Sequence, residues 1–375
     1  MKVVLIAPED LPIPPTRGGS VQIYLQALYE LLKNHPGIVA HLISPGNKSR
    51  VVLHSPQGLQ NHPHTLPLPP AQTYRHSLLY LLQSIHPDVV QIENRPNLVM
   101  SIAHQLPTVP VVLNLHSMTF LGPRHIPPKL ARQVLRSADA VVFNSHYLAH
   151  TVAHHFNLST PLENGHVIYP GVDLERFTPR IAPLPPPPPL RLIYVGRIIP
   201  QKGVHVLLTA LHQLKLQGQS IHLTMVGKTP PWERAYGMTI ERLGKGLHIN
   251  RLGFLPPRVL PAHLWEHHAL VCPSQYKEAF GLVNVEAMAA GLPVIASRIG
   301  GIPEIVDESC GQLVTTPQSP HNWVRALNHW LEHPQTYLQA CTGAKKRVQK
   351  FPWEQTARQF AILYETLLQS VQNSR

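Results

Sequence analysis

Short apolar segments alternate with helical segments along most of this 375-residue chain. The apolar segments are rich in Val, Ile and Leu and contain few polar residues. Strands of this kind are buried on both faces, as in parallel sheets that helices cover on both sides. In the first half the sequence predicts strands at residues 2–7, 39–44, 89–93, 109–116 and 140–144, with helices at 21–34, 74–84, 98–105, 129–137 and 145–155.

A proline-rich segment, residues 179–190, interrupts the alternation and contains five consecutive prolines. Such a run forms neither a helix nor a central strand, and it adopts a stiff polyproline conformation. The alternation then begins again, and a chain of this length exceeds one ordinary core. We therefore expect two α/β domains, residues 1–178 and 191–355, joined by a linker at 179–190. In the second domain we expect strands at 191–195, 222–226, 248–255, 269–272 and 293–296, with helices at 205–215, 233–243 and 259–267 and two or three closing helices from 321 to about 372.

The net basic charge of the chain bears on which classes of binding partner it can have. Lys and Arg exceed Asp and Glu by 32 to 20, which gives a net charge of +12 with neutral His. Because these residues are scattered and no nucleic-acid-binding signature is present, we expect no nucleic-acid partner. An ordinary solvated surface is the favoured interpretation, and weak attraction to a membrane surface or an anionic acceptor is the alternative.

The sequence also bears on cellular location. No apolar run reaches the roughly 18 residues of a membrane-spanning helix, and the first residues become polar too soon for a signal peptide. The three cysteines have neither metal nor redox spacing, and the histidines at 146, 150 and 154 have no carboxylate to complete a metal site. We therefore expect a cytoplasmic protein with reduced thiols and no bound metal.

A pair of glutamates, Glu278 and Glu286, belongs to the most specific motif of the chain. A Phe-Gly-Leu step lies between them, a helix of small residues follows, and a Gly-Gly-Ile-Pro-Glu sequence stands at 300–304. Backbone N–H groups near Gly281 and Leu282 would begin the helix and bind phosphate. The two carboxylates would reach hydroxyl groups on either side of that phosphate. A ligand with hydroxyls at both ends and phosphates between them is a nucleotide sugar.

At these residues the chain resembles the retaining glycosyltransferases of family 4, which have the GT-B fold. The resemblance implies two Rossmann-like parallel-sheet domains that face each other across a cleft, with a C-terminal helix, about 356–375, returning to the first domain. It also implies that Glu278 contacts the donor sugar and that Glu286 contacts the ribose. A buried helix with chance glutamates is the alternative, which the surrounding motif disfavours. The donor-binding residues expected are Gly18, Gly19, Gly196, Gly227, Phe280, Gly281, Leu282 and Glu286.

Two cations follow the first predicted strand of the second domain. Arg197 comes after Gly196, which allows a tight turn, and Lys202 lies a few residues further on. Together they can neutralise a diphosphate and stabilise the charge that develops on it as the sugar bond breaks. This Gly-Arg…Lys-Gly pattern serves that purpose in family 4. A surface turn with solvated charges is the alternative.

Features of the first domain complete the expected site. Gly18 and Gly19 precede the first long helix, either as an anion- or sugar-contacting turn or as a helix start that Ser20 caps. His116 ends a predicted strand, and family 4 enzymes commonly have a histidine there that serves the sugar or the acceptor. A structural histidine is the alternative.

A Glu-Asn-Arg-Pro sequence, which contains Glu93 and Arg95, resembles the branch of family 4 that includes bacterial spore-coat-associated glycosyltransferases. These two residues would then contact the acceptor, although an ion pair within a turn fits as well.

The resemblance implies transfer of a sugar, with retained configuration, from a UDP-, GDP- or ADP-sugar to a glycan, lipid-linked or protein acceptor of an envelope or coat. The expected catalytic residues are Arg197, Lys202, Glu278 and His116. No metal or other cofactor is expected, because the cations and the helix N-terminus supply positive charge and no Asp-x-Asp motif is present. The protein would be cytoplasmic, peripheral to the membrane or associated with a spore coat. Two alternatives stay open: a catalytically silent GT-B assembly protein of a coat or envelope, and a nucleotide-sugar epimerase.

Overall fold

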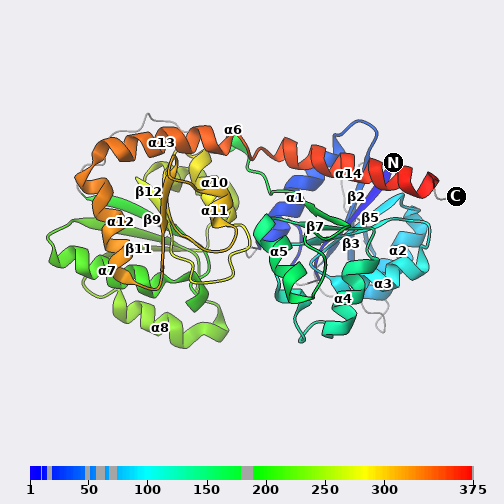
Figure 1. The fold of residues 1–375 in the computed structure, drawn as a ribbon, viewed down its shortest axis with the longest axis horizontal. Helices are drawn as coiled ribbons and strands as arrows, with labels where there is room; N and C mark the ends of the chain where they lie inside the picture. The colour runs from blue at the N-terminus through cyan, green and yellow to red at the C-terminus, as the bar shows by residue number, and fades with distance from the viewer. Residues whose placement is uncertain are drawn as a thin grey trace. The chain divides into compact units, whose positions relative to one another are not determined.

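The structure is a computed structural model that describes residues 1–9, 11–14, 19–46, 51–55, 64–66, 74–178 and 189–373. The chain divides into two compact units, each a β-sheet covered by helices (Figure 1). The N-terminal unit comprises Met1–Pro170 and Trp353–Arg375, and the C-terminal unit comprises Gly171–Pro352.

The N-terminal unit is built on a sheet of eight strands among the described residues, in the order β4-β3-β2-β1-β5-β6-β7-β8. All neighbouring strands are parallel except at β3 and β4, which pair antiparallel. The strands are β1 (Lys2–Ile6), β2 (Val39–Pro45), β3 (Val51–His54), β4 (His64–Leu66), β5 (Val89–Glu93), β6 (Val111–Leu115), β7 (Ala140–Phe143) and β8 (Gly165–Val167). The helices are α1 (Ser20–Lys33), α2 (Tyr74–Ile85), α3 (Pro96–Gln105), η1 (Thr119–Leu121), α4 (Pro128–Ser137), α5 (His146–His155) and α14 (Trp353–Asn373).

The last helix, α14, belongs to the N-terminal unit, as expected. Figure 1 shows α14 beside α1, and apolar residues of both helices share one core with alternate residues of the central strands. Because side chains alternate between the faces of a strand, this core covers one face of the sheet. Its members include Val3, Leu5, Leu25, Leu28, Leu42, Val112, Phe360 and Tyr364.

The C-terminal unit has a fully parallel sheet of six strands among its described residues, in the order β11-β10-β9-β12-β13-β14. The strands are β9 (Leu190–Val195), β10 (Ile221–Val226), β11 (His248–Gly253), β12 (Ala269–Cys272), β13 (Val294–Ser297) and β14 (Gly311–Val314). The helices are α6 (Leu174–Phe177), η2 (Pro200–Lys202), α7 (Val204–Leu216), η3 (Pro231–Glu233), α8 (Arg234–Leu243), η4 (Pro257–Val259), α9 (Leu260–Trp265), α10 (Leu282–Ala289), α11 (Ile302–Ile305), α12 (Pro320–Glu332) and α13 (Pro334–Val348).

Four strands were not predicted from the sequence. The strands β3 and β4 form an antiparallel extension of β2, so the first sheet is not parallel throughout. The other two, β8 and β14, lie at the sheet edges. Short edge strands need few apolar residues, so their sequences, such as Gly-Gln-Leu-Val in β14, lack the continuous apolar pattern of the central strands.

The change from one unit to the other comes at Gly171, earlier in the chain than the expected end of the first domain at residue 178. The backbone N–H of Val172 donates to the carbonyl of Phe351 at 2.8 Å, and the indole of Trp265 donates to the carbonyl of Phe177 at 3.4 Å. These bonds hold 171–178 in the C-terminal unit. Most of the expected linker, 179–188, lies outside the described residues. Within the described residues, no helix combines the length and apolar character that crossing a membrane requires.

A close backbone approach fixes the end of β10 against the turn after β9. Gly227 has a φ of 131°, and a Cβ at this position would lie 1.9 Å from the carbonyl oxygen of Gly196. We predict that Gly227→Ala lowers the free energy of unfolding of the C-terminal unit by about 3 kcal/mol, because both the positive φ and the steric clash oppose the new side chain.

The matched control is Gly218→Ala, because Gly218 has a φ of 80° with nothing within 4 Å of the added Cβ. The free energy of unfolding of this variant should fall by only about 1 kcal/mol, because the positive φ alone opposes the new side chain. Urea unfolding followed by tryptophan fluorescence measures both, since Trp232, Trp265, Trp323 and Trp330 all lie in the C-terminal unit. An equal decrease in the free energy of unfolding in the two variants would contradict the close approach of Gly227 to the carbonyl of Gly196.

Candidate functional site

The expected donor-site residues of the C-terminal unit gather at the carboxyl edge of its parallel sheet. Loops that follow neighbouring parallel strands meet at one edge. The loop after β9 bonds to the loop after β10, with Ile198 N–H donating to the carbonyl of Lys228 at 3.0 Å. The loop after β13 bonds to the loop after β12, with Gly301 N–H donating to the carbonyl of Glu278 at 3.0 Å. Four loops that are distant in sequence thus form one surface.

An ion pair between Lys202 and Glu278 lies at the centre of this edge. The Lys202 ammonium contacts Oε2 of Glu278 directly, and the Ser274 hydroxyl donates to the same oxygen at 2.9 Å. Burial alone would raise the pKa of Glu278, but the charge and hydrogen bond of Lys202 outweigh it and hold the pKa below its ordinary value. Burial likewise opposes the charge on Lys202, yet the carboxylate raises the pKa of this amine above normal. Both groups are therefore charged at neutral pH.

Arg197 adds a second cation near this pair. Its side chain is exposed, its carbonyl accepts a 2.6 Å hydrogen bond from the Tyr194 hydroxyl, and its charge contributes to lowering the pKa of Glu278. The two predicted cations thus lie at the same sheet edge, where both influence the Glu278 carboxylate, and the Arg197 side chain is open to solvent.

The helix α10 carries the second half of the glutamate motif. Gly281 is its N-cap with a φ of 95°, and Leu282 is its first residue. The N–H groups of Leu282 and Val283 therefore have no partner within the helix, whereas the N–H of Asn284 donates to the carbonyl of Gly281 at 2.9 Å. Glu286 is half-buried, and burial raises the pKa of its carboxyl to about 7. The side chain of Phe280 is buried, with its ring edge-on to Phe351 at 6.1 Å between centroids, and its expected contact with the donor stays a prediction.

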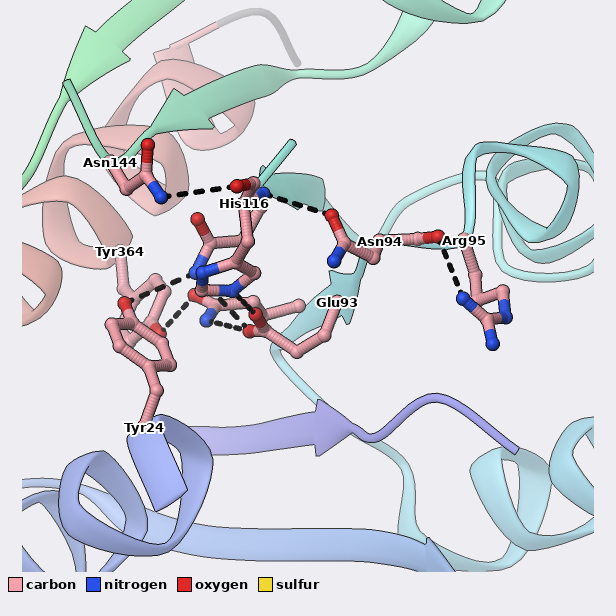
Figure 2. Close-up of polar contacts among 9 residues, drawn as sticks. Tyr24, Glu93, Asn94, Arg95, His116, Asn144 and Tyr364 are labelled. Atoms are coloured by element: carbon pink, nitrogen blue, oxygen red, sulfur yellow. Dashed lines mark hydrogen bonds and ion pairs between the residues drawn. The ribbon is translucent and has the colours of Figure 1, made fainter. Parts of the chain in front are cut away.

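In the N-terminal unit, His116 follows β6 as predicted and belongs to a polar network (Figure 2). Its Nε2 lies 2.5 Å from Oε2 of Glu93, its backbone N–H donates to the side chain of Asn94 at 2.9 Å, and its carbonyl accepts from Asn144 at 3.2 Å. Glu93 is fully buried. Its expected contact with the acceptor is therefore replaced here by a contact with His116.

Arg95 lines a small pocket, together with Glu9, Asn94, Pro96, Asn97, Phe120 and His125. The guanidinium lies 4.1 Å from the centroid of the Phe120 ring and pairs with the Glu9 carboxylate at 2.5 Å. The alternative of an ion pair within the turn is wrong, because Arg95 pairs with Glu9, 86 residues away in the chain, and Glu93 contacts His116.

The glycine turn before α1 is only partly described. Gly18 lies outside the described residues, whereas Gly19 is the N-cap of α1 with a φ of 125° and no side-chain capping bond. Ser20 is already the first residue of the helix, so the alternative in which Ser20 caps the helix is wrong. Within the described residues no three His, Cys, Asp or Glu side chains are placed to hold a metal ion.

Sequence reasoning missed several polar residues that support the site. Ser274 bonds to Glu278, Gln91 and Asn114 bond to Glu93, and Tyr364 bonds to Gln91. The sequence offered one signal, since Gln91 and Asn114 interrupt otherwise apolar strands. Tyr364 gave none, because it reaches β5 from a helix 273 residues away in the chain.

Sequence comparison decides the family. The profile of glycosyl transferases group 1 matches residues 178–347, and that of Glycosyltransferase Family 4 matches residues 11–176. The chain belongs to the family 4 type of glycosyltransferases. This glycosyltransferase is 26% identical to spore coat protein SA of Bacillus subtilis over 97% of its own length and 99% of that protein. It is 31% identical to a D-inositol 3-phosphate glycosyltransferase of Jonesia denitrificans, over 68% of its length and 66% of the relative.

Solved structures confirm the GT-B fold. Sucrose-phosphate synthase from Thermosynechococcus elongatus superposes with a TM-score of 0.77 at 23% identity, covering 98% of this glycosyltransferase and 99% of that chain. Anabaena HepE in complex with UDP superposes with a TM-score of 0.74 at 21% identity. The superposition covers 98% of this glycosyltransferase and 100% of the HepE chain. The fold predicted from the sequence is therefore confirmed.

The two glutamates of the motif should respond to pH in opposite ways. The pKa of Glu286 is raised to about 7, so neutral Glu286 stabilises the fold below the unfolded pKa near 4.5, and this contribution is lost as pH rises through about 7. We predict that Glu286→Gln is more stable than the wild type at pH 8 by roughly 1 to 3 kcal/mol, and that this advantage is smaller at pH 5, where much of the effect has not yet developed.

Glu278→Gln is the matched control on the same motif. The pKa of Glu278 is lowered, so its carboxylate stabilises the fold above the unfolded pKa and loses this effect as pH falls through the folded pKa. Glu278→Gln should therefore be less stable than the wild type at pH 8. Urea unfolding at pH 5 and pH 8 measures both variants, and shifts of the same sign at pH 8 would contradict the assigned environments.

Proposed function

We propose that this glycosyltransferase moves a sugar from a nucleotide diphosphate-sugar to a hydroxyl group of an envelope, coat or glycan acceptor, with retention of anomeric configuration. The observation that carries the proposal is the charged Lys202–Glu278 pair, with Arg197 beside it and the N-terminus of α10 following in the same loop. Positive groups that are fixed before the reaction can stabilise the negative charge that develops on a departing diphosphate.

In this proposal each residue has a separate role. Arg197 and Lys202 bind the diphosphate, and the first turn of α10 donates N–H groups to it. Glu278, held in place by Lys202 and Ser274, accepts hydrogen bonds from the donor sugar. Glu286 accepts hydrogen bonds from the ribose, for which its carboxyl must ionise. These groups supply the positive charge without a metal ion, and the reaction should be metal-independent.

The donor and acceptor classes rest on different observations. HepE was solved with UDP and with UDP-glucose, which makes a UDP-sugar the first donor to test. The likeness to spore coat protein SA supports a coat or envelope acceptor. We assign the acceptor to the pocket at Arg95, because Asn94 and His125 offer polar groups there and Asn94 also bonds to His116.

The charge assignment predicts the behaviour of two variants. Lys202→Ala and Arg197→Ala should each lower turnover by about two to three orders of magnitude, because each removes a preorganised charge from the leaving group. The measurement is release of UDP from UDP-glucose, with GDP- and ADP-sugars as further donors and water or free glucose as acceptor. Lys346→Ala, which removes a lysine from the exposed surface of α13, is the control and should keep normal turnover.

The same assay separates the alternatives. Near-normal turnover in both Arg197→Ala and Lys202→Ala would contradict the charge assignment. An epimerase would change the sugar without releasing nucleotide diphosphate, and a silent assembly protein would do neither. Chelation with EDTA should leave UDP release unchanged if the reaction is metal-independent.

A further inference from the structure

A buried carboxylate contacts His116 through one ring nitrogen only. Oε2 of Glu93 lies 2.5 Å from Nε2 of His116, and the Glu93 side chain has no exposed surface. The other oxygen, Oε1, accepts hydrogen bonds from the amides of Gln91 at 2.6 Å and Asn114 at 3.3 Å. The two amides are donors, and the contact with Nε2 of His116 is the one whose direction depends on the tautomer of the ring. A carboxylate can only accept hydrogen bonds, so an ionised Glu93 requires the proton of this contact to lie on Nε2 of His116.

A tyrosine of the C-terminal helix determines which groups of this network donate hydrogen bonds and which accept them. Tyr364 of α14 donates its hydroxyl proton to Oε1 of Gln91 at 2.6 Å (Figure 2). Burial raises the pKa of this phenol well above its ordinary value, so it remains a donor. With its oxygen held by Tyr364, the Gln91 amide must turn its NH₂ group toward Glu93. Tyr364 thus sets the orientation of the Gln91 amide. That amide donates to Glu93, and Glu93 in turn contacts His116.

The remaining contacts of His116 hold the ring without using Nδ1. Its backbone bonds to Asn94 and Asn144, and the ring of Tyr24 packs edge-on at 4.6 Å between centroids (Figure 2). Within the described part of the chain, Nδ1 has no hydrogen-bond partner. In neutral histidine with a proton on Nε2, Nδ1 is an acceptor.

We propose that Tyr364, Gln91 and Glu93 are positioning residues that hold neutral His116 as the Nε2–H tautomer, so that Nδ1 accepts a hydrogen bond from a substrate hydroxyl. The substrate contact rests on the proposed function, whereas the tautomer does not. Glu93 then acts on the substrate through His116. The C-terminal helix contributes to the site because its Tyr364 orients the Gln91 amide. The same arrangement of carboxylate and histidine fixes the tautomer in other enzymes.

The direct test is the tautomer itself. In Glu93→Gln, the Oε1 position still faces the amides of Gln91 and Asn114, so the new NH₂ group must face Nε2 of His116. This forces the proton of His116 onto Nδ1. ¹⁵N NMR of histidine-labelled protein distinguishes protonated from bare ring nitrogens, and the His116→Gln spectrum identifies the His116 signals.

Two NMR outcomes are decisive. Bare Nδ1 in the wild type and bare Nε2 in Glu93→Gln would support the proposal. A bare Nε2 in the wild type, or no change in Glu93→Gln, would overturn it. This readout requires no turnover, so failure of the proposed function would leave it intact and would appear separately as absent UDP release.

Turnover tests whether Tyr364 acts through His116. With UDP-glucose as the probe, Glu93→Gln should lower UDP release about 100-fold, at the lower end of effects for a misplaced acid–base group. Tyr364→Phe should lower it several-fold, and this loss should vanish in a His116→Ala background, because coupled residues are not additive. An equal loss in both backgrounds would show that Tyr364 is merely structural.

The control for Tyr364→Phe is Tyr337→Phe. Tyr337 is also buried, and its hydroxyl donates to the carbonyl of His268 at 3.0 Å in the C-terminal unit. Losing a buried hydroxyl there should leave UDP release and its dependence on His116 unchanged. A loss in Tyr337→Phe that matched Tyr364→Phe would overturn the assignment of Tyr364 as a specific positioning residue.

Discussion

The ion pair between Lys202 and Glu278 is the interaction on which the candidate donor site depends. It joins the loop after β9 to the loop after β12, and Ser274 and the backbone of Gly301 hold the glutamate from other sides. Separating two partly buried charges leaves each one unpaired, which is costly. The pair therefore fixes the positions of the carboxylate and the ammonium relative to each other, and in the proposed function these are the groups that face the donor sugar and its diphosphate. Preorganisation of this kind is where enzymes obtain much of their electrostatic catalysis.

Burial of the Glu286 carboxyl has a cost in stability, and the proposed ribose contact would explain why the chain bears it. Its carboxyl is half-buried on α10, and burial raises its pKa to about 7, so part of the population is neutral at physiological pH. A ligand with two hydroxyl donors would stabilise the ionised form. Stability without ligand and affinity for ligand thus oppose each other at this residue, as they commonly do in functional sites.

The architecture was predictable because it follows from local patterns. Continuous apolar strands such as β5 and β12 were read directly from the sequence, and the cations and glutamates of the motif fall at one sheet edge because parallel strands end together. Their roles toward a donor stay predictions. The edge strand β14 and the boundary at Gly171 were not predictable, since both depend on packing partners far away in the chain.

The contacts of the buried polar network in the N-terminal unit could not be predicted from the sequence. Glu93 was expected to contact the acceptor because the Glu-Asn-Arg-Pro sequence resembles the spore-coat-associated branch of family 4. It is buried instead, because His116, Gln91 and Asn114 satisfy both of its oxygens. Tyr364 could not have been assigned to this network, since no local pattern connects α14 to β5. Only the folded chain brings these residues together.

Calorimetric titration of the wild type with UDP, GDP and ADP, repeated with Lys202→Ala and Glu286→Ala, tests the central claim most directly. The account predicts that at least one nucleotide diphosphate binds and that both substitutions weaken its binding. The matching nucleoside, which lacks the diphosphate, should bind more weakly and should be insensitive to Lys202→Ala. Binding that persists unchanged in both variants, or no binding of any of the three nucleotides, would contradict a diphosphate site built around Lys202 and Glu278.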